Sequence, residues 1–309
     1  MILENIFPET PDRDTIAEKK PAMQLRAFLR TGRKGIGKRM KEIERIPLEG
    51  LHNTRDLGGF KTADGRKIRP HRLLRSGQLL GMTKQDERML LEEYDLKTVV
   101  DFRTEREKQE SPDPVPAGVA YYEIPILSEL AVGITRDRES ERRMLRLLSE
   151  RLKDGVDAAA EYMRGLYRSI VKEEYSRRQY RRFFEILLKQ EEGAVLWHCS
   201  AGKDRAGVGT AYVLWALGVP DETVYADYRR VNSLTGEAVE EQLARIRERI
   251  PDEGLLSCLR SLMQVQDGYL KSVQDEILQD YGSIDRFLEQ EMGLDPERRA
   301  RMQERYLEG

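Results

Sequence analysis

The chain has 309 residues, of which 39% are hydrophobic and 35% charged, and its formal net charge is −2. This length allows one large domain or two with a substantial core, and the nearly balanced charge gives no reason to expect nucleic-acid binding. No apolar run approaches the ~18 residues of a membrane span, and no basic region followed by an apolar core opens the chain, so neither a transmembrane helix nor a secretory signal is expected.

Residues 1–45 are expected to form a basic N-terminal extension. Between Arg26 and Arg45, eight basic side chains face only two acidic ones, Glu42 and Glu44. Two interpretations stay open for this segment. It is either attracted to an anionic membrane or inositol phosphates, as a peripheral contact, or it is a solvated, partly helical extension.

The folded domain is expected to span residues 46–309, and its first motif is the glycine-rich run Asn53–Gly59 (NTRDLGG). Arg55 and Asp56 either pair with each other to fix this turn or contact a substrate directly. Hydrophobic patterns and turn residues predict the elements that follow: a hairpin turn at Asp64-Gly65, a strand over Leu73–Ser76, a helix capped by Thr83 with Asp86, and strands over Lys97–Phe102 and Val119–Ile124.

Asp101 lies near the carboxyl end of the strand Lys97–Phe102, which is the ligand side of an open α/β sheet. It is either a second catalytic acid or one half of an Asp–Arg pair that organises the loop after the strand. From residue 128 to about residue 190 the pattern shows helices only. The earlier part, roughly 130–165, is richly charged.

A buried strand, a tight loop and a helix follow one another in the middle of the chain. The strand runs from Ala194 to Trp197, the loop from Cys199 to Arg205 and the helix from about Ala206 to Leu217. A helix N-terminus offers unpaired N–H groups and a partial positive charge, which suit a tetrahedral oxyanion. The same field favours the thiolate of Cys199, and the planar guanidinium of Arg205 can hold two phosphate oxygens. The loop therefore predicts a phosphate site with a nucleophilic cysteine.

Helices are also expected after this unit. Turn and cap residues predict one helix from Asp221 that ends at Asn232, a second over Leu234–Arg249, one or two more within 255–281, and further starts at the Ser283 cap and at Asp295-Pro296. The second cysteine, Cys258, stands among leucines and is interpreted as a small core residue. With no disulfide framework, a reducing cytoplasm is the expected location, although export without a classical signal is compatible with the same sequence.

The eight residues His198–Arg205 (HCSAGKDR) resemble the HCX5R loop of the cysteine-dependent protein tyrosine phosphatase superfamily. The run Asn53–Gly59 is similar to the N-x-R-D-[LI]-G-G opening of a bacterial branch that includes secreted mycobacterial and Listeria phosphatases, and Asp101–Arg103 resembles its D-L-R element. The resemblance covers roughly residues 46–306. It implies an α/β fold with a central, mostly parallel sheet flanked by helices, and an insertion at about 128–190 that contributes a helical lid. An ordinary solvated helical hairpin is the other interpretation of that insertion.

The resemblance also implies residue roles. Cys199 is the nucleophile, Arg205 binds phosphate and Asp204 is the leaving-group acid, with Asp101 as the second candidate for the acid. The loop that would bind a phosphate or sulfate comprises Ser200, Ala201, Gly202, Lys203, Arg205 and Ala206, and the supporting residues are His198, Asp101, Arg55 and Asp56. Lys203 either adds positive charge for polyanionic substrates or faces solvent. Neither a metal nor a cofactor is expected, since His52, His71 and His198 are scattered.

The implied substrates are phosphotyrosine proteins, with phosphoserine and phosphothreonine in some members, and phosphoinositides. An inositol phosphate or phosphoinositide phosphatase without protein substrates would use the same loop. A catalytically slow phosphate-binding module would also use this loop, and only Ala206 supports that alternative. A sulfurtransferase or an arsenate reductase also uses a loop thiolate. Arsenate reduction, however, usually needs a resolving cysteine, and Cys258 has no loop context for that role.

Ala206 departs from the family pattern, which places Ser or Thr directly after the arginine, where the hydroxyl stabilises the departing thiolate. Hydrolysis of the phosphoenzyme is therefore expected to be slow relative to its formation, and Ala206→Thr is expected to raise turnover. Pre-steady-state kinetics should show a burst of product in the wild type that shrinks in the variant. A wild-type trace without a burst contradicts this expectation.

Overall fold

The computed structural model describes residues 45–51, 53–128, 134–135, 155–249 and 251–309. The predicted basic extension lies outside these residues apart from Arg45, as does most of the charged part of the predicted insertion. The compact unit that contains the described residues runs from Ile43 to Gly309. The boundary between an extension over 1–45 and a domain over 46–309 stays a prediction.

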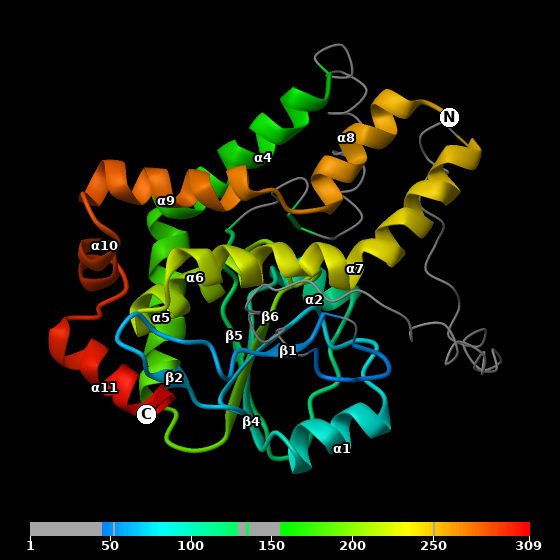
Figure 1. Cartoon of the computed structure of the whole chain (residues 1–309). Helices are drawn as coiled ribbons and strands as arrows, with labels where there is room; N and C mark the ends of the chain where they lie inside the picture. The colour runs from blue at the N-terminus through cyan, green and yellow to red at the C-terminus, as the bar shows by residue number, and fades with distance from the viewer. Residues whose placement is uncertain (1–44, 52, 129–133, 136–154, 250) are drawn as a thin grey trace, which may run out of the picture. The chain divides into compact units, whose positions relative to one another are not determined.

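A five-stranded sheet forms the centre of this unit, in the order β1-β3-β6-β4-β5 (Figure 1). The strands are β1 (Arg55–Asp56), β3 (Leu73–Ser76), β6 (Ala194–His198), β4 (Leu96–Asp101) and β5 (Ala120–Glu123). β3, β6, β4 and β5 are parallel, and only β1 runs antiparallel to its neighbour β3. The mostly parallel sheet flanked by helices is thus confirmed. Because parallel strands end at one edge, the register places Ser76 beside His198 and His198 beside Asp101.

Successive side chains of β6 point alternately to the two faces of the sheet. Ala194 and Leu196 belong to a cluster on one face that includes Leu90 of the helix α1 (Lys84–Glu92). Trp197 points to the other face, where its ring lies 5.3 Å from that of Phe183. All five residues of β6 are buried, as expected for a central strand covered on both sides.

Nine further helices lie in the described part of the chain. They are α2 (Glu105–Glu110), α4 (Gly155–Lys172), α5 (Glu174–Lys189), α6 (Arg205–Leu217), α7 (Asp221–Arg249), α8 (Glu253–Met263), α9 (Asp267–Tyr281), α10 (Ile284–Gln290) and α11 (Pro296–Tyr306). α4 packs against α8 and α9, away from the sheet (Figure 1). At the end of the chain, β7 (Leu307–Glu308) pairs with β2 (Lys67–Ile68). α4 and α5 confirm helices within 128–190, whereas a lid function of this segment stays a prediction.

Most start and stop signals act as predicted. Thr83 and Asp86 form a complete capping box, Ser283 caps α10, and Asp295 caps α11 with Pro296 in the first turn. The expected break at Asn232 is wrong, because α7 continues through it as one helix. The amide of Asn232 bonds instead to both backbone groups of Val265, in the connection between α8 and α9, so a tertiary partner replaces the predicted cap.

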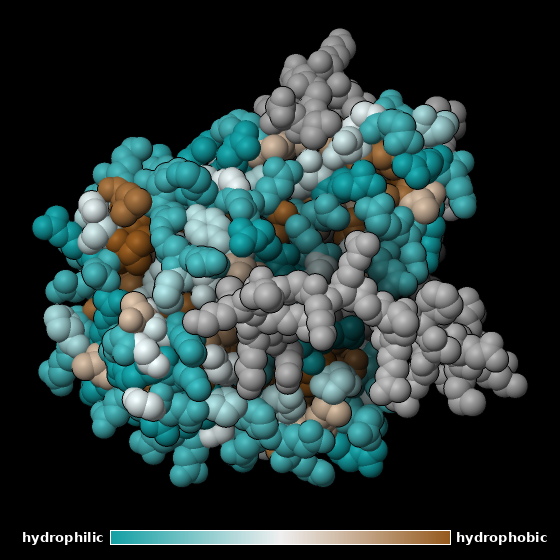
Figure 2. Space-filling model, in the orientation of Figure 1, coloured by the Kyte–Doolittle hydropathy of each residue, from teal (hydrophilic) through white to brown (hydrophobic). Residues whose placement is uncertain are grey.

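No helix in the described part of the chain is long and apolar enough to cross a membrane. The face drawn in Figure 2 is largely hydrophilic outside the grey atoms, with hydrophobic colour confined to small areas. This agrees with the charged composition of the sequence.

Phe183 of α5 tests the packing beneath the sheet. Its fully buried ring contacts those of Phe102 and Trp197, so Phe183→Ala should leave a cavity next to β6. We expect a loss of about 3–5 kcal/mol in the free energy of unfolding, measured with urea. The matched control is Leu278→Ala at an exposed position of α9, where a change within about 0.5 kcal/mol is expected. Equal effects at the two positions would contradict this account of the core.

Candidate active site

The loop between β6 and α6 brings the predicted site residues together. Cys199 follows the last residue of β6 and is only 2% exposed, and Arg205 opens α6 with its side chain fully buried. Asp204 occupies the N-cap position of α6, but its side chain makes no capping hydrogen bond. The first turn of the helix therefore keeps its N–H groups and its partial positive charge directed toward the loop.

Three consecutive carbonyl groups of the loop are held from outside. Their donors are Gln78 N for Ser200 O (3.0 Å), Asn53 Nδ2 for Ala201 O (2.9 Å) and the Arg75 guanidinium for Gly202 O (2.8 Å). The peptide bonds are trans, so each N–H points away from the carbonyl of the same peptide. The N–H groups of residues 201–203 thus face the opposite, concave side, which is the arrangement of an anion-binding loop.

Gly202 is the one loop residue whose conformation requires glycine. Its φ is +70°, and a Cβ placed there would lie 2.4 Å from the carbonyl oxygen of Ser76 and 2.7 Å from Asn53 Nδ2. The close approach of the loop to β3 is therefore possible only without a side chain.

A buried cluster behind the loop explains the role of Arg55. Its guanidinium bonds to Asp227 of α7 (2.7 Å) and to Asn53 Oδ1 (2.7 Å), and Arg75 bonds to the other oxygen of Asp227 (2.5 Å). Burial, followed by the charge of Arg75, lowers the pKa of Arg55 to about 10 against the opposing effect of Asp227. Since Asn53 and Arg75 hold the loop carbonyls, Arg55 supports the loop from behind.

Of the two interpretations left open for Arg55 and Asp56, their pairing with each other is wrong. Asp56 accepts hydrogen bonds from the backbone N–H groups of Gly58 and His71, each at 2.8 Å. It fixes the glycine-rich turn without a cation, and burial raises the pKa of its carboxyl group. Successive side chains of a strand point to opposite faces, so Arg55 points to the other face of β1 from Asp56, where it bonds to Asp227.

Arg205 is held in place by Glu107 of α2. The two guanidinium NH₂ groups reach the two carboxylate oxygens at 2.7 and 2.8 Å, and the Ser200 hydroxyl donates to the same carboxylate at 2.5 Å. Burial by itself raises the pKa of Glu107, but the charge and hydrogen bonds of Arg205 outweigh it, so that the pKa falls to about 2. Nε of Arg205 is buried and has no acceptor among the described residues. A phosphoryl oxygen in the loop would supply one.

Asp204 is buried and bonded to two donors through the same oxygen. Lys203 Nζ lies 2.8 Å from its Oδ1, and the hydroxyl of Tyr167, on α4, donates to that atom at 2.7 Å. Tyr228 of α7 donates in turn to the Tyr167 oxygen at 2.8 Å. Lys203 is only 2% exposed, so the interpretation of Lys203 as a solvent-facing residue is wrong.

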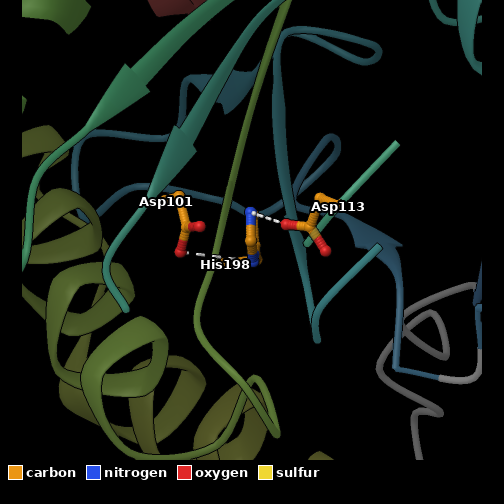
Figure 3. A group of neighbouring side chains, drawn as sticks. All are labelled: Asp101, Asp113 and His198. Atoms are coloured by element: carbon orange, nitrogen blue, oxygen red, sulfur yellow. Dashed lines mark ion pairs between the residues drawn. The ribbon is translucent and has the colours of Figure 1, made fainter. Parts of the chain in front are cut away.

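A second buried cluster lies under Cys199, at the carboxyl ends of β4 and β6. His198 stands between Asp101 and Asp113, with Nε2 3.2 Å from Asp113 and Nδ1 3.8 Å from Asp101 (Figure 3). Arg103 bonds to both carboxylates, at 2.8 and 2.6 Å. Burial raises the pKa of Asp101, but His198 and Arg103 outweigh it and hold that pKa well below its usual range. This geometry favours the Asp–Arg pair over a second catalytic acid.

Asp101, Asp113 and His198 are also residue types that bind metal ions, and their ligand atoms lie within 4.8 Å of one another. The guanidinium of Arg103 already donates to both carboxylates, and Tyr121 donates to Asp101 at 2.6 Å. The guanidinium of Arg103 therefore already balances the charge of the Asp101 and Asp113 carboxylates. The three residues do not fit a divalent metal ion, because that ion would need the same carboxylate oxygens as ligands.

Four residues that contact the predicted ones were not expected from the sequence: Glu107, Asp113, Tyr167 and Asp227. Glu107 carries a local signal, because it forms a capping box with Thr104 at the start of α2. That spacing predicts where the helix starts, but it does not predict that the Glu107 carboxylate also bonds to Arg205. Tyr167 and Asp227 lie far along the chain from their partners, and no local pattern marks them. Asp113 lies only 10 residues after Arg103 but far from His198, and no local pattern marks it either.

Comparison with known proteins places this geometry in a family. The profile described as the tyrosine phosphatase family matches residues 46–308. A Cupriavidus necator protein that carries the name of a tyrosine-protein phosphatase is 28% identical over 271 residues, which cover 85% of this chain and 89% of that protein. The triple specificity protein phosphatase PtpB of Mycobacterium tuberculosis is 29% identical over 263 residues, covering 78% of this chain and 91% of PtpB.

A solved structure of TpbA from P. aeruginosa in complex with phosphotyrosine was also found. It is 15% identical, and the match covers 67% of this chain and 89% of TpbA with a TM-score of 0.24. A score this low establishes no common arrangement.

Glu107→Gln tests the ion pair. Because the folded pKa of about 2 lies below the ordinary 4.5, ionised Glu107 stabilises the fold above about pH 4.5, and this stabilisation is lost as the pH falls toward 2. The variant should be less stable at pH 6, and its deficit should shrink by about 3 kcal/mol at pH 2–3, as measured by urea unfolding. The exposed control Glu304→Gln should follow the wild type at both pH values. An undiminished deficit at low pH contradicts the ion pair.

Proposed function

The chain belongs to the tyrosine phosphatase family and is a phosphoric monoester hydrolase, and on this premise we propose that it dephosphorylates phosphotyrosine proteins through a cysteinyl-phosphate intermediate on Cys199. The observation that carries the proposal is the loop before α6, where outward-held carbonyls leave N–H groups on the concave side around Cys199. The unpaired Nε of Arg205 adds a charged donor to that side. Together these groups suit the equatorial oxygens of a phosphoryl group.

In the first step, Sγ of Cys199 attacks phosphorus in line with the ester bond. The S–P bond forms as the P–O bond to the leaving group breaks, and Asp204 gives its proton to the leaving oxygen. Both donors to Asp204 end on Oδ1, so Oδ2 is the oxygen that carries this proton. The product of the step is a cysteinyl phosphate and an alcohol, which is the tyrosine side chain of a protein substrate.

In the second step, water attacks the same phosphorus atom. The Asp204 carboxylate accepts a proton from this water, the S–P bond breaks, and inorganic phosphate and the Cys199 thiolate are released. The helix N-terminus and Arg205 stabilise the charge of the phosphoryl group in both transition states. Ala206 offers no hydroxyl to the departing thiolate, which supports a slow second step.

The bidentate bond to Glu107 fixes the orientation of Arg205 before a substrate arrives. A guanidinium held in this way loses little conformational entropy when it binds the phosphoryl group. Ser200, bonded to the same carboxylate, fixes the adjoining part of the loop.

Phosphotyrosine is favoured by the depth of the site. Cys199 is almost fully buried, and a tyrosine side chain carries its phosphate farther from the peptide backbone than serine or threonine does. The relative PtpB is named for triple specificity, so phosphoserine, phosphothreonine and phosphoinositides are the additional substrates to test. A thiolate that oxidation would inactivate fits a reducing compartment such as the cytoplasm.

Hydrolysis of 4-nitrophenyl phosphate tests the proposal. Cys199→Ser should lower kcat by at least about 10³-fold, because the hydroxyl is a far weaker nucleophile at neutral pH. Cys258→Ser is the matched control, since Cys258 is also a buried free cysteine, and burial raises the pKa of its thiol. We expect this control to keep wild-type activity and acid quenching of the wild type to trap a phosphoenzyme.

Three outcomes overturn the proposal. Phosphate release that survives Cys199→Ser excludes the cysteinyl intermediate. Tight phosphate binding without release identifies a phosphate-binding module. Activity on inositol phospholipids but none on phosphotyrosyl peptides, in a side-by-side assay, excludes protein substrates.

A further inference from the structure

Tyr167 and Tyr228 form a buried hydrogen-bonded chain that ends on Asp204. Tyr228 donates to the Tyr167 oxygen at 2.8 Å, Tyr167 donates to Oδ1 of Asp204 at 2.7 Å, and all three side chains are at most 2% exposed. We infer that Tyr167 is a positioning residue for Asp204 and that Tyr228 supports it from behind. This inference rests on the role proposed above for Asp204 as the leaving-group acid.

The geometry restricts how the carboxyl group of Asp204 can turn. Tyr167 and Lys203 both bond to Oδ1, from α4 and from the loop itself, so the carboxyl plane is held from two directions. Asp204 makes no other side-chain hydrogen bond to the described residues, which leaves Oδ2 directed away from both donors. A proton transfer needs its donor oxygen within about 3 Å of the acceptor, so a fixed Oδ2 is a functional requirement.

The surroundings keep Tyr167 a donor. Burial and then the charge of Asp204 raise its pKa well above the usual range, so its hydroxyl stays protonated. The charged or titratable groups around Asp204 are Lys203 and Arg205 from the loop, Tyr167 from α4, Tyr180 from α5, Tyr228 from α7 and Tyr269 from α9. Of these, only Lys203 and Tyr167 bond directly to the carboxylate.

The chain also connects the acid to two elements outside the loop. Tyr167 lies on α4, which packs against α8 and α9, and its ring lies 5.6 Å from that of Tyr269 of α9, whereas Tyr228 lies on α7. Tyrosine at these positions serves packing and hydrogen bonding together, since the rings of Tyr167 and Tyr228 meet edge to face at 6.3 Å. A phenylalanine would preserve the packing and remove only the hydroxyl.

Tyr167→Phe separates positioning from packing. Asp204 loses one of the two donors on its Oδ1, so its carboxyl plane is then held from one direction only. The freed carboxyl group should turn out of line. We expect kcat/KM for phenyl phosphate, a poor leaving group, to fall about 10- to 100-fold, and that for 4-nitrophenyl phosphate to fall about 3-fold or less.

Two further variants belong to the same experiment. Tyr228→Phe should lower kcat/KM for phenyl phosphate by a smaller factor, because it weakens the donor rather than removing it. Tyr212→Phe is the matched control, since Tyr212 is a fully buried tyrosine of α6 whose hydroxyl has no partner among the described residues. We expect Tyr212→Phe to keep the wild-type kcat/KM for both substrates.

Asp204→Asn distinguishes failure of this inference from failure of the proposed function. If Asp204→Asn lowers kcat/KM far more for phenyl phosphate than for 4-nitrophenyl phosphate, Asp204 is the acid, and a Tyr167→Phe variant with the same kinetics as Tyr212→Phe then overturns the positioning role alone. If Asp204→Asn leaves the leaving-group dependence unchanged, the proposed acid itself is wrong. A Tyr167→Phe variant that loses stability and lowers kcat/KM equally for phenyl phosphate and 4-nitrophenyl phosphate shows a merely structural tyrosine and also overturns the inference.

Discussion

A short loop can offer its N–H groups to an anion only if other groups take its carbonyl oxygens. In this protein the donors are Gln78, Asn53 and Arg75, which approach the loop from the segments around β1 and β3. The antiparallel strand β1 is thus needed at the edge of the sheet, because it places Asn53 beside the loop. The same close approach requires glycine at position 202. The anion-binding property of the loop therefore depends on the packing behind it.

That packing is charged, and the four cations Arg55, Arg75, Lys203 and Arg205 each have a carboxylate partner. Asp227 serves both Arg55 and Arg75, Glu107 serves Arg205, and Asp204 accepts from Lys203. Removing one member of such a pair leaves an uncompensated buried charge, which typically costs about 3–5 kcal/mol. The residues that shape the site are thus also residues that stabilise the fold, so their roles in chemistry and in stability have to be measured separately.

Local patterns in the sequence predicted the central strand, the loop and the helix after it, whereas the mostly parallel sheet was what the family resemblance implied. The sequence also predicted Cys199, Asp204 and Arg205 as the central residues, and the structure brings them together at the start of α6. It could not predict that Asn232 lies inside a helix or that Arg55 pairs with Asp227, since in both cases a distant partner decides the outcome. The spacing of Thr104 and Glu107 is that of a capping box at the start of α2, but no local pattern indicates the bond from Arg205 to Glu107.

The way these partners are distributed along the chain bears on how the site forms. Glu107, Tyr167 and Asp227 come from α2, α4 and α7, which reach the loop from different parts of the sequence. Contacts of this kind form only when the helices have docked on the sheet, because each holds a charge or a hydroxyl that would otherwise remain in water. The HCSAGKDR loop alone therefore supplies the reacting atoms, whereas the orientation of Arg205 and Asp204 is a property of the assembled domain.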